Sequence, residues 1–129
     1  MKFLSVYKTK ERATPPSPAE MERMGKLVEE GFKSGKLLAT EGCMPTVFGA
    51  RVRQDADTGT VTVTDGPFSE AKEVIGGFAI FQAASKAEAI KYVREFLSVV
   101  GQGECELRQV YEAGDAIPCT EHAAKAQQA

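Results

Sequence analysis

Two segments of this chain begin with the start signal of an amphipathic helix. Ser17 and Ser85 are each followed, three residues later, by a glutamate, and apolar side chains then recur at spacings of three and four. This arrangement is typical of a capping box that opens a helix with one apolar face. It predicts helices over residues 18–34 and 86–100, and each helix needs another element on which to pack that face.

Segments with the pattern of strands stand before, between and after these two helices. The segment 60–64 alternates strictly between threonine and valine, which is typical of a strand with one face in water. The segment 76–83 is apolar on both faces, which indicates a central strand of a sheet. The predicted strands cover residues 2–8, 36–42, 47–53, 60–64, 76–83 and 104–111.

The order of these elements is β-α-β, an inserted β-hairpin, and β-α-β. A split pair of β-α-β units with both helices on one face is the ferredoxin-like arrangement, so we predict an α+β fold of this kind. The two helices would cover one face of the sheet. The other face carries apolar side chains mixed with charged ones, and a second subunit or a ligand is needed to cover it.

Composition and charge exclude several classes of function. Hydrophobic residues make up 43% and charged residues 26% of the 129 residues, the balance of a soluble globular domain. The net charge is −2 with both signs spread along the chain, so nucleic acid is not an expected partner. No apolar run approaches the roughly 18 residues of a membrane span. Residues 1–8 are too short an apolar stretch for a signal peptide, so we expect a cytoplasmic protein.

The cysteines and the single histidine predict neither a disulfide framework nor a metal site. Cys43, Cys105 and Cys119 are odd in number and far apart, whereas zinc ligands and disulfide frameworks show close or paired spacings. His122 lies in a polar, alanine-rich stretch near the end of the chain. We therefore expect no metal and no cofactor, and we interpret the cysteines as small residues in or beside the core.

The segment from Val63 to Phe78, which contains Asp-Gly-Pro-Phe at residues 65–68, resembles the signature of the DGPF-domain proteins, a branch of the YCII-related family. Residues 35–38 resemble the segment after that family's first helix, and the acidic and arginine residues of 104–108 resemble its closing strand. The resemblance covers roughly residues 1–112, and we expect residues 113–129 to be a loosely ordered tail.

This resemblance implies a ferredoxin-like subunit that pairs as a homodimer into a dimeric α+β barrel. Better-known YCII relatives carry a histidine–aspartate pair proposed as catalytic, but residues 21–32, the corresponding part of the first helix, contain no histidine. That pair is therefore not carried over to this chain. The resemblance also implies a link with alternative sigma factors of the extracytoplasmic-function type, and hence with signalling or the stress response.

Asp65 is the sharpest candidate for a functional side chain, because a carboxylate at the end of a strand, fixed by a following turn, can act as a base or polarise a ligand. The alternative is that Asp65 only organises the Asp-Gly turn. Lys72 and Glu73 lie in the loop before the predicted central strand, where binding residues are common on a rigid scaffold. The alternative for these two is a solvated surface pair.

A second group of candidates is charged and shares one face of the sheet. Glu104, Glu106 and Arg108 alternate along the last strand, and Glu41 and Arg51 come from neighbouring strand segments. Charges buried on the uncovered face must pair, meet water or meet a polar ligand. They are candidates for ligand binding; the alternative is an ion-pair network that only fixes the geometry of a dimer.

These residues leave two hypotheses for function. In the first, the chain binds or transforms a small polar molecule in a pocket of the dimeric barrel, with Asp65 as the base and Arg108 as the clamp for an anionic group. In the second, it is a non-catalytic accessory or interaction module in a sigma-factor-linked signalling or stress-response pathway. The sequence does not decide whether the protein is an enzyme.

Overall fold

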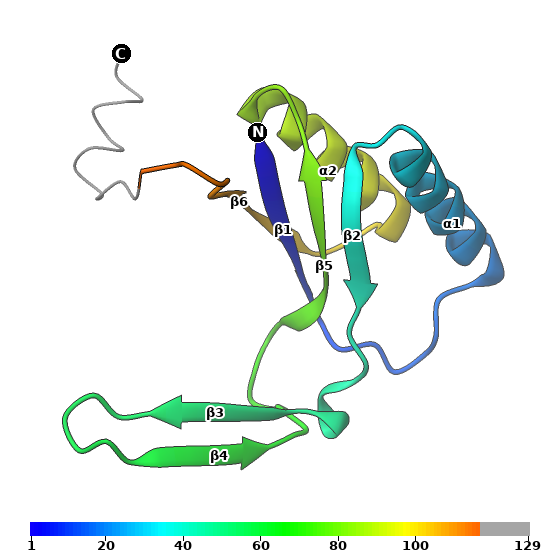
Figure 1. Cartoon of the computed structure of the whole chain (residues 1–129). Helices are drawn as coiled ribbons and strands as arrows, with labels where there is room; N and C mark the ends of the chain where they lie inside the picture. Colours follow the sequence, from blue (N-terminus) through cyan, green and yellow to red (C-terminus); the bar gives the residue numbers. More distant parts are fainter. Residues whose placement is uncertain (117–129) are drawn as a thin grey trace.

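A four-stranded antiparallel sheet, two helices and a separate hairpin make up the structure, a computed structural model that describes residues 1–116 (Figure 1). The strands of the sheet follow the order β2-β5-β1-β6. This is the ferredoxin-like α+β arrangement predicted from the sequence. The elements of the sheet and its helices are β1 (Lys2–Thr9), α1 (Pro18–Lys33), β2 (Leu37–Gly42), β5 (Val74–Gln82), α2 (Lys86–Val100) and β6 (Glu104–Val110).

Both helices begin at the serine caps that the sequence predicts. The backbone N–H of Glu20 donates to the Ser17 hydroxyl at 3.2 Å, and that of Glu88 donates to the Ser85 hydroxyl at 3.1 Å. Helix α2 ends at Gly101, whose φ of 79° is the left-handed conformation that favours glycine at this position.

The hydrophobic core lies between the sheet and α2. Its buried side chains are Phe3 from β1, Phe81 from β5, Ala83 and Ala89. No residue of α1 is buried, although α1 and α2 lie on the same face of the sheet (Figure 1). Helix α1 therefore stands away from the sheet and closes the core less tightly than α2 does.

The opposite face of the sheet is open over the part of the chain that the structure describes. The ladder between β1 and β5 sets Leu4 opposite Ile80 and Val6 opposite Phe78, so these four half-buried side chains form an apolar strip along the middle of this face. The charged side chains of β6 lie beside the strip, on the same face. The predicted combination of apolar and charged groups on one sheet face is therefore present.

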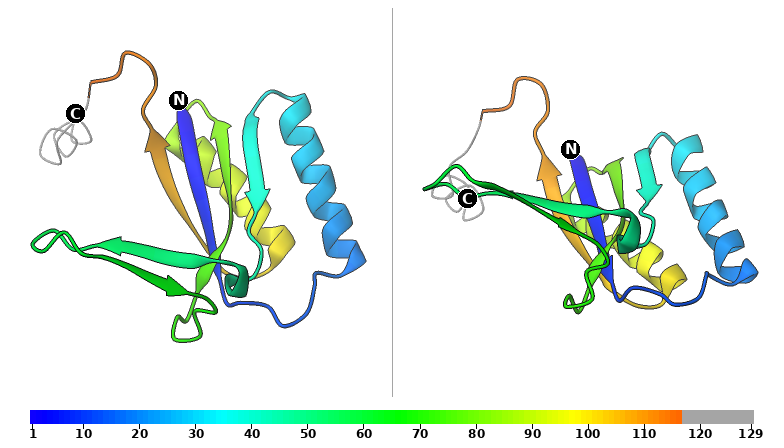
Figure 2. Two further views of the ribbon diagram at one scale, coloured as in Figure 1. Left: turned by 60° about the horizontal axis from the view of Figure 1, so that its bottom comes forward. Right: turned by 90° about the horizontal axis from the view of Figure 1, so that it is seen from below.

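The inserted hairpin consists of β3 (Ala50–Gln54) and β4 (Val61–Asp65), which form a separate two-stranded sheet. Residues 47 and 48, predicted as the start of the first of these strands, instead belong to a short 3₁₀ turn over Thr46–Phe48. The turn carries the chain out of β2 before the hairpin begins. In both views of Figure 2 the hairpin and α1 extend to opposite sides of the sheet.

Candidate functional site

Lys8, Glu106 and Arg108 form a cluster of ion pairs on the open face. The Lys8 ammonium lies 3.2 Å from one carboxylate oxygen of Glu106, and an Nη atom of Arg108 lies 3.5 Å from the other. The hydrogen bond from Lys8 and its positive charge, followed by the contribution of Arg108, hold the pKa of Glu106 below its ordinary value. Glu104 is exposed on the same strand, opposite Lys8 across the ladder.

Arg51 does not join this cluster. Its guanidinium forms an ion pair of 2.5 Å with Glu70 and lies 3.8 Å from the centre of the Phe68 ring. The pKa of Glu70 is lowered first by a hydrogen bond from the backbone N–H of Glu70 to its own carboxylate, and then by the hydrogen bond from Arg51. Arg51 therefore helps to fix the loop that follows β4 onto the base of the hairpin.

Asp65, the last residue of β4, is exposed and lies opposite Ala50 in the hairpin. Its carboxylate makes no hydrogen bond or ion pair with any other residue among 1–116. Lys72 and Glu73 are exposed in the loop before β5, and Glu41 is exposed on β2. Within one chain, the structure thus joins only Glu106 and Arg108 among the residues predicted from the sequence for a site.

The cysteines differ in exposure. Cys43 is exposed, whereas Cys105 is half-buried beside Ser5, and burial raises the pKa of the Cys105 thiol. Cys119 and His122 lie outside the described residues. Within residues 1–116, no group of three or more histidine, cysteine, aspartate or glutamate side chains is arranged to hold a metal ion.

A groove of about 840 Å³ lies on the other side of the sheet, between α1, α2 and the strands. Its walls are mainly apolar side chains of the two helices, and its floor is made of small residues of the sheet, such as Gly77 and Ala79. Because these residues are small and α1 stands away from them, the space is not filled by the chain itself. The apolar walls include Met21, Met24, Leu27, Val28, Val93 and Phe96.

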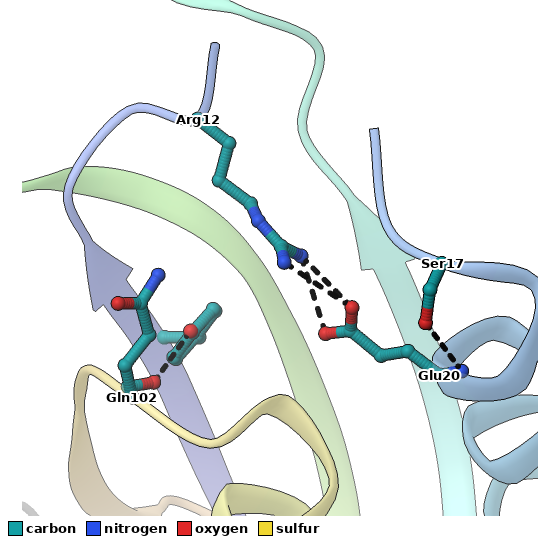
Figure 3. Close-up of polar contacts among 5 residues, drawn as sticks. Arg12, Ser17, Glu20 and Gln102 are labelled. Atoms are coloured by element: carbon teal, nitrogen blue, oxygen red, sulfur yellow. Dashed lines mark hydrogen bonds and ion pairs between the residues drawn. The ribbon is translucent and has the colours of Figure 1, made fainter. Parts of the chain in front are cut away.

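Glu20, one of the residues that line the groove, forms an ion pair with Arg12 (Figure 3). Both terminal nitrogens of Arg12 bond to the Glu20 carboxylate, each at 3.2 Å. The Glu20 side chain is only 12% exposed, so the guanidinium supplies the compensation that a poorly solvated carboxylate requires. The hydroxyl of Tyr7, which also lines the groove, donates to the backbone carbonyl of Gln102 at 2.6 Å.

The groove also carries a cation. The Lys36 ammonium lies 4.8 Å from the centre of the Tyr92 ring. The hydrogen bond and the charge interaction with Tyr92 raise the pKa of Lys36. The Tyr92 hydroxyl in turn bonds to the carboxylate of Glu88. The groove therefore has a mainly apolar lining that includes Lys36 and the Arg12-paired Glu20, and the exposed Glu30 and Glu95 also line it.

The sequence did not single out Lys8, Arg12 or Lys36. Lys8 follows Leu4 and Val6 with the period of two that places it on their face, so the alternation of β1 contained the necessary signal. Arg12 lies in an irregular segment, and its pairing with Glu20 depends on how that segment runs past the start of α1. No periodicity in the sequence predicts this contact.

Comparison with known proteins agrees with the fold. The YCII-related domain matches residues 1–113 of this chain, which include every helix and strand described above. An uncharacterized protein of Rhizobium meliloti (strain 1021) is similar to this chain, with 33% identity over 86 residues, or 64% of this chain and 68% of that protein. Within residues 1–116, no helix has the length and apolar character needed to cross a lipid bilayer. On the match over residues 1–113, the chain belongs to the family of YCII-related domains.

Proposed function

We propose that this protein binds a small amphipathic molecule in the groove between α1, α2 and the sheet. The observation that carries this proposal is the groove itself, which is concave, mainly apolar and about 840 Å³ in volume. Pockets for small molecules in proteins commonly measure roughly 300 to 1,000 Å³ and are lined by apolar groups with a few polar ones.

The charges that line the groove indicate the chemical class of the ligand. The Lys36 ammonium has Tyr92 as its neighbour rather than a direct carboxylate partner among residues 1–116, and it can receive an anionic group. Arg12 and Glu20 form an ion pair, so their opposite charges cancel. A molecule with an apolar body and one anionic group that contacts Lys36 is the class we propose, and the exposed carboxylates of Glu30 and Glu95 disfavour a second anionic group.

Gly25 offers a direct test, because it lines the groove and a Cβ atom at this position would meet no atom within 4 Å. Gly25→Leu should fill part of the groove and also favour the helix. The probe is 8-anilinonaphthalene-1-sulfonate, whose rings and sulfonate match the expected class. We expect Gly25→Leu to weaken binding of the probe at least about fivefold in a fluorescence titration. Lys36→Met should also weaken binding, and this loss of affinity should become smaller as the salt concentration rises.

The matched control is Lys26→Leu, an equally apolar substitution at the exposed neighbouring position. This variant should bind the probe with the affinity of the parent chain. Equal weakening in both variants, or in neither, would show that the probe binds elsewhere. Native mass spectrometry of freshly purified protein then asks whether a cellular molecule is retained, and Gly25→Leu should lose it.

A second candidate site is favoured by the ion pairs of the open face. We propose that two copies of the chain form a homodimer in which each copy covers the open face of the other, and that a small polar molecule binds beside Glu106 and Arg108. The apolar strip next to the cluster supports pairing, because residues 1–116 provide no other element to cover it. Asp65, Glu104, Lys72, Glu73, Glu41 and Arg51 remain the further candidates for this site.

Arg108→Met and Asp65→Asn test the second site. Both should abolish retention of a polar ligand while the protein remains a dimer in light scattering. If both variants retain the ligand seen with the parent chain, the open face is not its site. A homodimer that retains no small molecule at either place would instead support the non-catalytic accessory role in a sigma-factor-linked pathway.

We place the chain in the DGPF branch on the strength of residues 65–68 and expect it in the cytoplasm.

A further inference from the structure

The β3–β4 hairpin exposes apolar side chains that nothing in residues 1–116 covers. Every residue of both strands is exposed, and the strands pair only with each other. Val52, Val61 and Val63 are 70%, 55% and 61% exposed. An isolated two-stranded hairpin is marginally stable in water, so one with an uncovered apolar face calls for a partner surface.

The two faces of the hairpin differ in character. Residues directly opposite one another across the ladder share a face, so Val52 and Val63 lie together. Val61, two residues before Val63, lies on the same face. Arg53 and Thr62 form a rung of the other face. The hairpin is therefore amphipathic, with a valine face and a face of arginine and threonine, as expected if one side meets protein and the other meets water.

Contacts at its base hold the hairpin in a defined direction. The Glu11 carboxylate accepts hydrogen bonds from the backbone N–H and the hydroxyl of Thr46, at 2.6 and 2.8 Å. The same hydroxyl accepts a bond from the backbone N–H of Phe68 at 3.1 Å. The N–H of Gly66 donates to the carbonyl of Gly49 at 2.9 Å. These bonds tie both strands of the hairpin to the segment after β1, so the hairpin projects as an anchored arm.

A second copy of this chain offers the matching surface. Its open sheet face has an apolar strip with charged residues beside it, and the arm has an apolar face with Asp65 as its single charged residue. In the cluster beside the strip, Lys8 and Arg108 both contact the carboxylate of Glu106, and Lys8 also lies opposite Glu104 across the ladder. Asp65 lacks an ion-pair partner in its own described chain, and Arg108, whose side chain is 71% exposed, can accept it as a second carboxylate partner beside Glu106. In a dimer with two-fold symmetry, the valine face of each arm would cover the apolar strip of the other copy.

We propose that the β3–β4 hairpin is an arm that lies with its valine face on the open sheet face of a second copy of the chain. It brings Asp65 to the cluster formed by Lys8, Glu106 and Arg108 of the partner subunit. The polar site of the open face is then built from two chains, because Asp65 of one subunit completes the cluster of the other. This inference rests on the homodimer proposed above and is independent of the groove.

Photo-cross-linking of the full chain tests the placement of the arm. A benzoylphenylalanine is introduced at Val63, on the valine face, or at Thr62, on the opposite face, and each variant is mixed with isotopically labelled parent chain before irradiation. We expect the probe at Val63 to link to peptides of β1, β5 or β6 in the labelled copy, and the probe at Thr62 to give few such links.

Sedimentation measurements supply a second, milder test. The double variant Val52→Thr/Val63→Thr keeps the shape and strand preference of both positions, yet it should raise the dimer dissociation constant at least about tenfold. Arg53→Gln on the other face should change it less than about twofold. A dimer in which Val63 links within its own chain, or away from the sheet face, would overturn the arm while leaving the homodimer intact. A chain that is monomeric at all concentrations would overturn both.

Discussion

The carboxylate of Glu20 accepts hydrogen bonds from both terminal nitrogens of Arg12, while its backbone N–H donates to the Ser17 cap (Figure 3). A glutamate three residues after a serine cap often turns its carboxylate back to the start of the helix, and Glu88 does so by accepting from the N–H of Ala84 at 2.8 Å. In Glu20 this carboxylate is instead directed to Arg12. The start of α1 is thereby tied to the segment that follows β1.

Replacing Arg12 by methionine should destabilise the protein, because the 12%-exposed carboxylate of Glu20 would lose its charged partner. We expect a loss of about 1–2 kcal/mol in the free energy of unfolding, since Arg12 itself is partly exposed. Urea denaturation of the full chain measures this. The double variant Arg12→Met/Glu20→Met should recover part of the loss, and a double variant less stable than Arg12→Met alone would contradict this account of the pair.

The Glu88 carboxylate should make the stability of the protein depend on pH in the acid range. The hydrogen bond from Tyr92, followed by that from Ala84, holds the pKa of Glu88 below its ordinary value of 4.5. A depressed pKa in the folded state adds stability that is present above the unfolded pKa and is lost as the pH falls through the folded one.

In Glu88→Gln this contribution is absent at every pH. The difference in urea midpoint between the parent chain and Glu88→Gln should therefore be largest near pH 7 and should shrink as the pH falls from about 5 to about 3. Lys86→Gln, an exposed substitution in the same turn of α2, serves as the control and should leave the shape of the pH profile unchanged. A difference in urea midpoint that stays constant across this pH range would show that ionisation of Glu88 does not stabilise the folded protein.

The fold could be predicted from the sequence because its signals are local and agree with one another. Two capped amphipathic helices and the alternation of the strands determine the ferredoxin-like order, and period-two alternation placed Glu106 and Arg108 on the open face correctly. The error over residues 47 and 48 arose because Val47 and Phe48 are strand-like by residue type, whereas Pro45 and the contact of Thr46 with Glu11 favour a turn.

The candidate site was less predictable, because its contacts depend on the path of irregular segments. Nothing in the sequence indicates that Arg51 packs on Phe68 and pairs with Glu70 instead of meeting the charges of β6. The groove was also not foreseen, since the apolar stripe of α1 predicts a tightly packed helix. The sheet residues that face this stripe, such as Gly77 and Ala79, are too small to fill the space between the sheet and α1.

The two cysteines of the described residues should react with iodoacetamide at very different rates. Cys43 is exposed, whereas Cys105 is half-buried and burial raises the pKa of its thiol, so less of the reactive thiolate is present. In the Cys119→Ser chain at pH 8, mass spectrometry should find Cys43 alkylated at least about tenfold faster than Cys105. The two rates should converge in denaturant. Equal rates in the folded protein would contradict the half-buried position of Cys105 beside Ser5.

Gly66 should tolerate no side chain, because a Cβ atom at this position would lie 1.6 Å from the carbonyl oxygen of Thr46. Gly66→Ala must therefore displace the 3₁₀ turn at the base of the hairpin, at a cost of about 1–3 kcal/mol in the free energy of unfolding. Gly42→Ala is the matched control, since a Cβ atom there would meet nothing within 4 Å. We expect NMR spectra of Gly66→Ala to show shifts confined to the 3₁₀ turn and the hairpin, with the four-stranded sheet unchanged. Shifts spread over the whole sheet would mean that the arm and the domain fold as one unit, whereas stability equal to that of Gly42→Ala would disprove the close contact.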